Sequence, residues 1–244
     1  MLTVRLHPDG LRVEETPTPE PREGEVLVRV HAAAITRDEL QWPSGRLPAI
    51  PSYELSGVVV DTGEEVYGLT PFDRDGVAAE YAVAPVAVLA PKPASLSHVE
   101  AAALPMPGLT AWQALFDHGR LRRGERVIVT GARGGVGHVA VQLARHSGAE
   151  IVDNGPADLV FDTVGGQLPS GDRVVTIAAE APGADYFVVE PNRGQLIELA
   201  RLADAGDLRP AVDSTFPLER ALEAFDRLTA RGKHGKVVID VAGG

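Results

Sequence analysis

The stretch that decides the fold is TGARGGVGH, residues 130–138. It follows RVIVT at 126–130, a short apolar run typical of a buried strand, and it leads into an amphipathic stretch over 136–146. Glycines let the backbone turn sharply and approach a pyrophosphate, whose charge is stabilised at a helix N-terminus. The order strand, glycine turn, helix is therefore typical of the opening of a dinucleotide-binding unit. Because the spacing is not a strict G-x-G-x-x-G, a tight strand-to-helix turn without a ligand is the alternative.

On either side of this turn the two parts of the chain differ in pattern. Residues 1–90 contain short alternating runs such as EVLVRVHA at 25–32, separated by Pro and Gly, which predicts an antiparallel, barrel-like half. Further along, Ser97 and Glu100 form a capping box that predicts a helix start. The remaining expected helices cover 110–118, 136–147, 194–205 and 217–230, and the expected strands cover 126–130, 158–162, 173–177, 186–189 and 236–240.

The composition limits the classes of function. A formal net charge of −11 argues against a nucleic-acid partner, since phosphate backbones require clustered Lys and Arg. The longest apolar stretch falls far short of the ~20 residues that span a bilayer, and the N-terminus lacks a signal-peptide core, so we expect a cytoplasmic protein with no membrane partner. The chain has no cysteine, which excludes disulfides and thiolate zinc sites.

Several ordered motifs carry a resemblance to a known family. They are GEVLVRV (24–30), YELSG (53–57), PGLTAWQAL (107–115), GARGGVGHVAVQL (131–143), FDTVGG (161–166) and GKHGKVV (232–238). Together they resemble the zinc-free quinone-oxidoreductase (zeta-crystallin-like) branch of the medium-chain dehydrogenase/reductase family. The resemblance implies an α/β plus β fold. A GroES-like barrel domain would comprise 1–108 and 208–244, and a shortened Rossmann-type parallel-sheet domain would comprise 109–207.

The resemblance also implies a function and its residues. Relatives pass a hydride from NADP or NAD to a quinone- or enone-like small molecule. Tyr53 and Thr36 correspond to catalytic positions; Thr36 stands where relatives carry an Asn near the nicotinamide. The implied cofactor-binding residues are Thr110, Gly134, Gly135, Val136, Gly137, Asp153, Thr163, Phe187 and Lys236. A buried core tyrosine is the alternative for Tyr53, and a surface turn is the alternative for Lys236.

Partners and metals follow from the same comparison. Relatives lead us to expect a homodimer, formed by edge pairing of strand 186–189 or its neighbour. The zinc-dependent members use Cys, His and carboxylate ligands, whereas here Tyr53 precedes Glu54 and no Cys exists. We therefore expect neither a catalytic nor a structural zinc.

The nucleotide-binding half departs from the family pattern. Only residues 149–157 separate the end of the predicted helix 136–147 from strand 158–162, whereas a helical crossover needs at least about 10–12 residues. We therefore expect 149–157 to run along the bottom of the sheet, and strand 158–162 to lie beside 126–130. The missing elements would form the adenosine pocket.

Asp153 allows two interpretations. Residues 150–153 can be a stub of the second strand, in which case Asp153 would hold the ribose hydroxyls of NAD; a solvated connector is the alternative. No basic residue between Gly148 and Arg173 is available for a 2′-phosphate.

These departures leave a second hypothesis for the function. The chain would be a descendant with weakened or lost cofactor binding. It would use the interdomain cleft for a proton-transfer, dehydration or cyclisation step, or for ligand binding.

Overall fold

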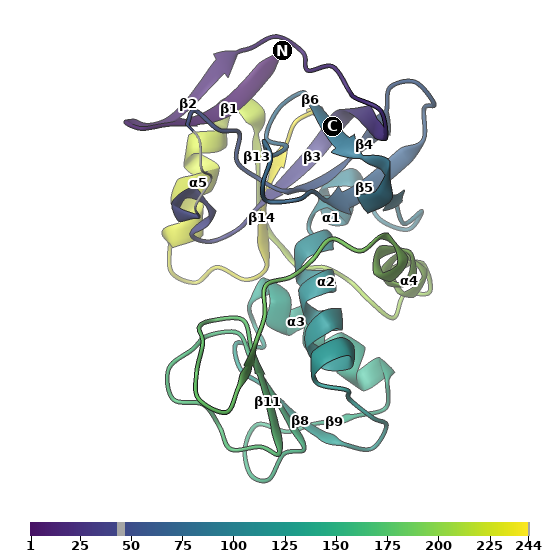
Figure 1. Ribbon diagram of the computed structural model, residues 1–244, viewed down its shortest axis with the longest axis vertical. Helices are drawn as coiled ribbons and strands as arrows, with labels where there is room; N and C mark the ends of the chain where they lie inside the picture. The colour runs from purple at the N-terminus through teal and green to yellow at the C-terminus, as the bar shows by residue number, and fades with distance from the viewer. Residues whose placement is uncertain (43–46, 244) are drawn as a thin grey trace.

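The structure, a computed structural model, describes residues 1–42 and 47–243 (Figure 1). These residues form a seven-stranded sheet, a five-stranded sheet and a two-stranded sheet of β1 and β2, connected by helices and loops. The barrel half holds β1 (Leu2–His7), β2 (Gly10–Glu15), β3 (Glu25–Ile35), β4 (Glu54–Val59), β5 (Glu65–Leu69), β6 (Tyr81–Pro85), β7 (Leu89–Pro91), β13 (Val212–Pro217), β14 (Lys236–Asp240), α1 (His98–Ala102) and α5 (Ala221–Thr229). The second half holds β8 (Arg126–Val129), β9 (Glu150–Ile151), β10 (Leu159–Asp162), β11 (Arg173–Thr176), β12 (Asp185–Tyr186), α2 (Pro105–Trp112) and α3 (Gly135–His146), and α4 (Arg193–Asp204) crosses between the halves.

The barrel half is built around β3, which pairs with β4, β6 and β14, all antiparallel. Val28, Val30 and Ile35 of β3 lie in its core, together with Phe225 of α5. The last strand, β14, thus joins a sheet begun more than 200 residues earlier, and its apolar run KVVID is buried where it pairs with β3 and β13.

The second half is a parallel sheet in the order β12-β11-β10-β8-β9. Leu159 of β10 pairs with Val127 of β8, which confirms that these two strands are neighbours. The two sheets together confirm the predicted α/β plus β fold class. The domain boundaries at 108/109 and 207/208 stay a prediction.

The connection after α3 corrects one expectation. Residues 149–157 do not run straight along the bottom of the sheet: Glu150 and Ile151 form β9, which pairs parallel with β8. The Glu150 N–H donates to the Glu125 carbonyl, and the Val152 N–H donates to the Val127 carbonyl. These bonds satisfy backbone groups at the sheet edge that would otherwise be unpaired. The stub-strand alternative is therefore correct, although only two residues of it are strand.

Three element boundaries also differ from expectation. The helix expected at 110–118 begins earlier, at Pro105, and continues through a wider helical turn at Gln113–His118. Pro105 suits a first helical position because its missing N–H has no partner to lose there. The strand expected at 186–189 is reduced to β12, and the helix expected at 217–230 starts only at Ala221, since β13 runs to Pro217.

The two faces of the parallel sheet are covered differently. Helices α2 and α3 pack against one face. On the other face Ile128 and Val160 are covered by loop residues Val152 and Ala157. A doubly wound sheet would carry helices on this face, so the shortening of the chain removes one of its layers.

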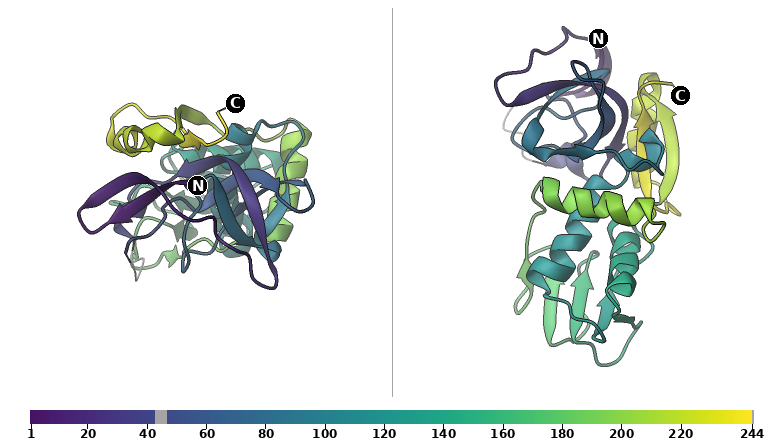
Figure 2. Two further views of the ribbon diagram at one scale, coloured as in Figure 1. Left: turned by 90° about the horizontal axis from the view of Figure 1, so that it is seen from above. Right: turned by 90° about the vertical axis from the view of Figure 1, so that its right-hand side faces the viewer.

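One apolar core joins the two halves. Tyr67 and Leu69 of the barrel pack in the same cluster as Leu109 and Phe161. The Tyr67 hydroxyl donates to the Leu196 carbonyl of α4 at 2.5 Å, where α4 lies across the junction (Figure 2). The halves are thus held in a defined relation. Within the described residues no helix is both long and apolar enough to span a membrane.

Candidate active site

The glycine turn has the shape that its sequence predicts. Gly131 adopts φ 66°, and a Cβ on Gly137 would lie 2.3 Å from the Gly131 carbonyl oxygen, so both positions require glycine. Gly134 precedes α3 without a side-chain cap. The first N–H groups of α3 have no acceptor within the helix, and they therefore offer an anion-binding site.

The barrel half reaches this turn through Lys236. A Cβ on Gly135 would lie 3.4 Å from the Lys236 Cδ, so the lysine stem rests on the first turn of α3. Val136, the next residue, is half-buried. The glycine turn and the start of β14 therefore form one interdomain site.

The head of Lys236 belongs to a buried network. Its Nζ forms an ion pair with the Glu54 carboxylate and donates to the Thr36 Oγ1 at 2.7 Å. Glu54 Oε2 lies 3.3 Å from the same hydroxyl, and Glu54 Oε1 accepts the Met106 N–H at 3.0 Å. Glu54 is wholly buried, and burial raises its pKa, although Lys236 opposes that rise. The sequence analysis did not predict the pairing of Glu54 with Lys236. The sequence feature that could have indicated it is that each residue is the charged first residue of an apolar strand, β4 and β14.

A second buried carboxyl adjoins the network. Glu39 accepts the Thr36 N–H at 2.9 Å and the Ser52 N–H at 3.1 Å. Burial raises the pKa of Glu39 to about 8, so most of this group is protonated at neutral pH. Sequence reasoning missed Glu39 as well, because nothing in the polar segment ITRDEL (35–40) marks one of its charged residues as buried.

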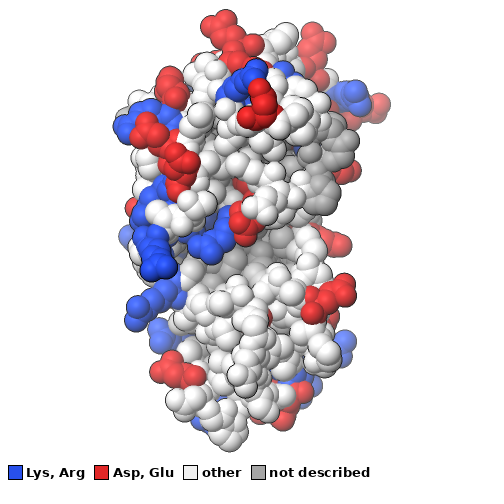
Figure 3. Space-filling model, turned by 90° about the vertical axis from the view of Figure 1, so that its left-hand side faces the viewer, with Lys and Arg blue, Asp and Glu red and all other residues white. Residues whose placement is uncertain are grey.

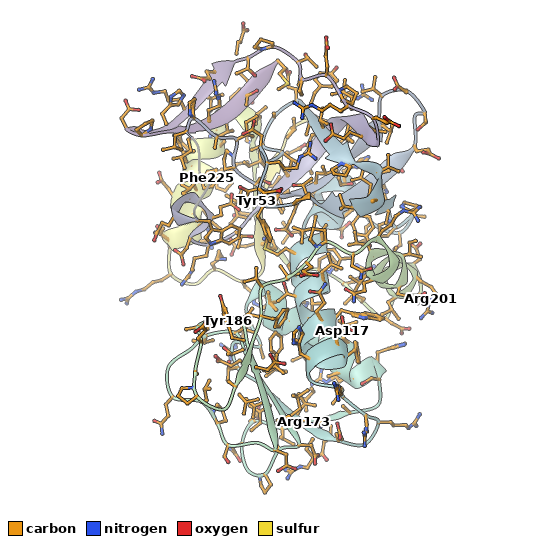
Figure 4. All side chains as sticks on the ribbon, viewed as in Figure 1. Tyr53, Asp117, Arg173, Tyr186, Arg201 and Phe225 are labelled. Carbon is orange, nitrogen blue, oxygen red and sulfur yellow. The ribbon has the colours of Figure 1, made fainter. Side chains whose placement is uncertain are left out.

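Tyr53 lies beside this network, in the chain position before Glu54. It is 7% exposed and packs against Trp42 and Phe72, at ring-centroid distances of 6.1 and 5.1 Å. Figure 4 labels it within the barrel half. The β3–β4 register pairs Ala34 with Glu54, which brings the Tyr53 segment next to the Thr36 segment.

Asp162 fixes the carboxyl ends of three strands. It accepts hydrogen bonds from the hydroxyls of Thr130 (2.5 Å) and Thr176 (2.9 Å) and from the Gly165 N–H. Burial alone would raise the pKa of Asp162, but these hydrogen bonds outweigh it and lower the pKa. Thr163 donates from its Oγ1 to the Thr130 carbonyl at 2.8 Å, which holds it against the glycine turn.

Other candidate residues lie apart from this site. Phe187 stacks on His118 at 4.3 Å and lines a hollow of about 450 Å³ that contains no glycine-turn residue. Asp153 lines another hollow, of about 700 Å³, with Pro169 to Asp172. Thr110 is buried within α2. The structure thus brings Thr36, Tyr53, Thr163, Lys236 and the glycines 134–137 to the interdomain junction, but it does not show Asp153 or Phe187 among them.

A serine, a histidine and a glutamate meet away from the junction. Ser56 Oγ lies 2.8 Å from His98 Nδ1, and His98 Nε2 lies 3.2 Å from Glu65 Oε1. The ring of His31 lies 4.2 Å from that of His98. Sequence reasoning found no such triad, because its members come from three elements. Ser56 is wholly buried, so the group cannot present a nucleophile to a substrate.

Cations gather at the mouth of the junction. Burial lowers the pKa of Lys233, and the nearby charges of Lys236, Arg37 and Arg227 lower it further, opposed by Asp213. Figure 3 shows Lys and Arg side chains beside the hollow between the two halves. Such a cluster in an acidic protein favours an anionic ligand. Over residues 1–42 and 47–243 no group of three or more His, Cys, Asp or Glu is placed to hold a metal ion.

The barrel half contacts the glycine turn of the parallel sheet, and this turn has the form of a dinucleotide-binding turn. Comparisons with known proteins agree. Residues 22–94 match the model of the alcohol dehydrogenase GroES-like domain, and residues 135–239 match the model named zinc-binding dehydrogenase.

Individual relatives indicate which kind of dehydrogenase or reductase this chain resembles. The quinone oxidoreductase of Thermus thermophilus, also solved in complex with NADPH, is 31% identical over 99% of this chain and 100% of its own, with a TM-score of 0.82. The quinone oxidoreductase of Coxiella burnetii is 25% identical over 99% of both chains, with a TM-score of 0.86. The chloroplastic NADPH-dependent alkenal/one oxidoreductase of Arabidopsis thaliana is 29% identical over 95% of this chain and 76% of its own. The chain belongs to the medium-chain dehydrogenase/reductase family, and it is an enzyme of the quinone-oxidoreductase type.

The shortening is visible in these comparisons too. The alignment with a probable zinc-binding oxidoreductase of Arthroderma benhamiae extends over 306 positions, against 244 residues in this chain. The relative, at 29% identity over 95% of this chain and 92% of its own, therefore contains segments that are missing here.

Proposed function

We propose that this enzyme is a zinc-independent NAD(P)H-dependent reductase of quinone- or enone-like small molecules. The observation that carries the proposal is the meeting of the uncapped N-terminus of α3 with the Thr36–Lys236–Glu54 network at one junction. One element suits the phosphates of a nucleotide, and the other offers hydroxyl and ammonium donors for a substrate oxygen.

The residues of the junction fit the pyrophosphate and nicotinamide end of the nucleotide better than its adenosine end. The N–H groups of Gly135, Val136 and Gly137 would hold the pyrophosphate, with Thr163 near the nicotinamide-bearing end. The adenosine end has only the two-residue β9 and the loop that follows it. When bound, the nucleotide supplies a hydride.

The protein's own groups act on the substrate. Tyr53 and Thr36 orient the carbonyl at the junction, and hydroxyl donors stabilise the negative charge that develops on its oxygen. In this proposal they replace a metal ion as the electrophile. The cations Lys233 and Arg37 at the mouth attract the anionic nucleotide.

Binding and turnover test the proposal. Calorimetric titration with NADPH and NADH should show saturable binding of at least one of them. The same protein should oxidise that nucleotide with a quinone or an enone, and its rate should be unchanged after treatment with a chelator. Absence of turnover across a panel of both substrate classes would overturn the proposal, and loss of activity with the chelator would overturn its zinc-independent part.

The short β9 favours a second candidate: an enzyme that has weakened or lost the nucleotide and uses the junction for proton transfer, dehydration or cyclisation. Lack of calorimetric binding of both nucleotides would favour it. Saturable micromolar binding of NADPH would exclude its cofactor-free form.

A further inference from the structure

The ion pair between Lys236 and Glu54 is buried, which is energetically unfavourable for charged groups. Lys236 is 7% exposed and Glu54 is wholly buried. Removing two charges from water is unfavourable, and the attraction within the pair only partly offsets it, so a buried pair is weak evidence for a stabilising role. A second lysine offers a comparison, since Lys92 also has a buried stem, but it faces the exposed carboxylate of Glu65 at 3.5 Å. Of these two pairs, the Lys236 pair alone removes both charges from solvent.

Thr36 is the most exposed member of the network that it forms with Lys236 and Glu54, and it is half-buried. Its hydroxyl accepts a hydrogen bond from Lys236 Nζ and is within donating distance of Glu54 Oε2 and Met106 Sδ, at 3.3 Å each. The Lys236 stem lies on the first turn of α3. The hydroxyl is therefore the half-buried group that is bonded to the buried ammonium, and the lysine that carries this ammonium lies against the first turn of α3.

We propose that Lys236 acts on the substrate through Thr36. During reduction the Thr36 hydroxyl gives its proton to the substrate, and the Lys236 ammonium returns a proton to the Thr36 oxygen. Glu54 holds the ammonium in place. This inference rests on the proposed function and identifies the proton source that it leaves open.

Hydride and proton reach different atoms of the substrate. Reduction of an enone adds a hydride from NAD(P)H to the β-carbon, which breaks the C=C π bond and leaves an enolate. The Thr36 hydroxyl gives its proton to the α-carbon of the enolate, and Lys236 returns a proton to the Thr36 oxygen. The products are the saturated ketone, NAD(P)⁺ and a neutral Lys236 amine, which takes a proton from water. Glu54 remains a carboxylate throughout.

The experiment uses 3-methyl-2-cyclohexen-1-one and the preferred nucleotide in D₂O with purified protein. Kinetic constants are measured, and NMR of the 3-methylcyclohexanone product shows whether the solvent deuterium on the α-carbon lies cis or trans to the methyl group. The variants are Thr36→Val, Thr36→Ser and Lys236→Met, with Lys92→Met as the matched control. In the wild type we expect deuterium on one face of the α-carbon, because a fixed donor protonates from one side.

The variants distinguish a role of Thr36 and Lys236 in proton delivery to the substrate from a role in packing of the protein. Thr36→Val and Lys236→Met should lower kcat about 100-fold and scramble deuterium over both faces, with KM changed by less than about threefold. Thr36→Ser keeps a hydroxyl and should restore single-face labelling. Lys92→Met should keep the kcat and the labelling of the wild type. Thermal unfolding identifies a variant that fails to fold; if Lys236→Met does so, Thr36→Val, which removes no charge, decides alone.

Two further results decide between the relay and its absence. Single-face labelling in both Thr36→Val and Lys236→Met, with kcat within about threefold of wild type, would overturn the relay and leave the proposed function intact. A nucleotide-free measurement covers the case in which the wild type does not reduce enones. The protein should then accelerate α-hydrogen exchange of cyclohexanone in D₂O, and Thr36→Val should abolish the acceleration. No acceleration by the wild type would overturn the relay.

Discussion

The ammonium of Lys236 donates a 2.7 Å hydrogen bond to the hydroxyl of Thr36, 200 positions earlier in the chain. The candidate site is therefore complete only when the last strand, β14, has paired with β3. The lysine stem also contacts the glycine turn, so one side chain links the barrel, the final strand and the nucleotide-binding turn.

The glycine turn should tolerate a methyl group at one position and not at another. Gly137→Ala places a Cβ 2.3 Å from the Gly131 carbonyl oxygen, which requires the backbone to shift. We expect a loss of about 3 kcal/mol in the free energy of unfolding, measured by urea denaturation. Gly135→Ala is the matched control, since its Cβ would meet Lys236 Cδ at an ordinary 3.4 Å, and it should not destabilise the protein. Equal stability of the two variants would contradict this account of the turn.

Nucleotide affinity should depend little on the adenosine. Because β9 has two residues and no helix follows it before β10, the adenosine end has few contacts to gain. We expect reduced nicotinamide mononucleotide to bind within about tenfold of NADH in calorimetric titrations, and Asp153→Asn to change the NADH affinity less than about threefold. A hundredfold preference for the dinucleotide, abolished by Asp153→Asn, would instead show that Asp153 holds the ribose.

Glu39 should make stability fall as the pH rises. Burial raises the pKa of Glu39 from 4.5 to about 8, so between these values the folded protein keeps a proton that the unfolded chain releases. The resulting stabilisation is fully present below pH 4.5 and is lost as the pH rises through 8. Between about pH 5 and 8 the wild type should lose at least about 2 kcal/mol more than Glu39→Gln, measured by urea unfolding.

The control for this pH dependence is Glu198→Gln, because Glu198 is an exposed acid paired with Arg201 on α4. It should follow the wild-type curve. Parallel curves for the wild type and Glu39→Gln would show that Glu39 is ionised throughout.

The expected homodimer should depend on the edge of the parallel sheet. β12 ends the sheet; its residue Tyr186 is 39% exposed, and Val188, two residues further on, is 59% exposed. Val188→Asp should convert a dimer to a monomer in sedimentation velocity, because a charge at an apolar contact must be desolvated. Val86→Asp, at a 50% exposed valine of the barrel, should leave the dimer intact. A wild-type protein of monomeric mass would refute the expected dimer.

The sequence by itself determined the features that depend on local chemistry. Gly131 and Gly137 occupy positions of the turn that only glycine fits, and Ser97 with Glu100 specifies a helix start that the structure confirms. The short spacing between α3 and β10 showed that a full crossover was missing, because a chain cannot span more than its length allows.

Only the tertiary structure decided which groups meet. Whether residues 150–151 pair as a strand depends on the free edge of β8, which lies 24 positions earlier and is invisible in local pattern. The burial of Glu39, and the pairing of Glu54 with Lys236 across 182 positions, likewise result from barrel closure. A charged side chain has the same sequence signature in water and in a core; the chain segments that fold over it determine its solvation, its partner and its pKa.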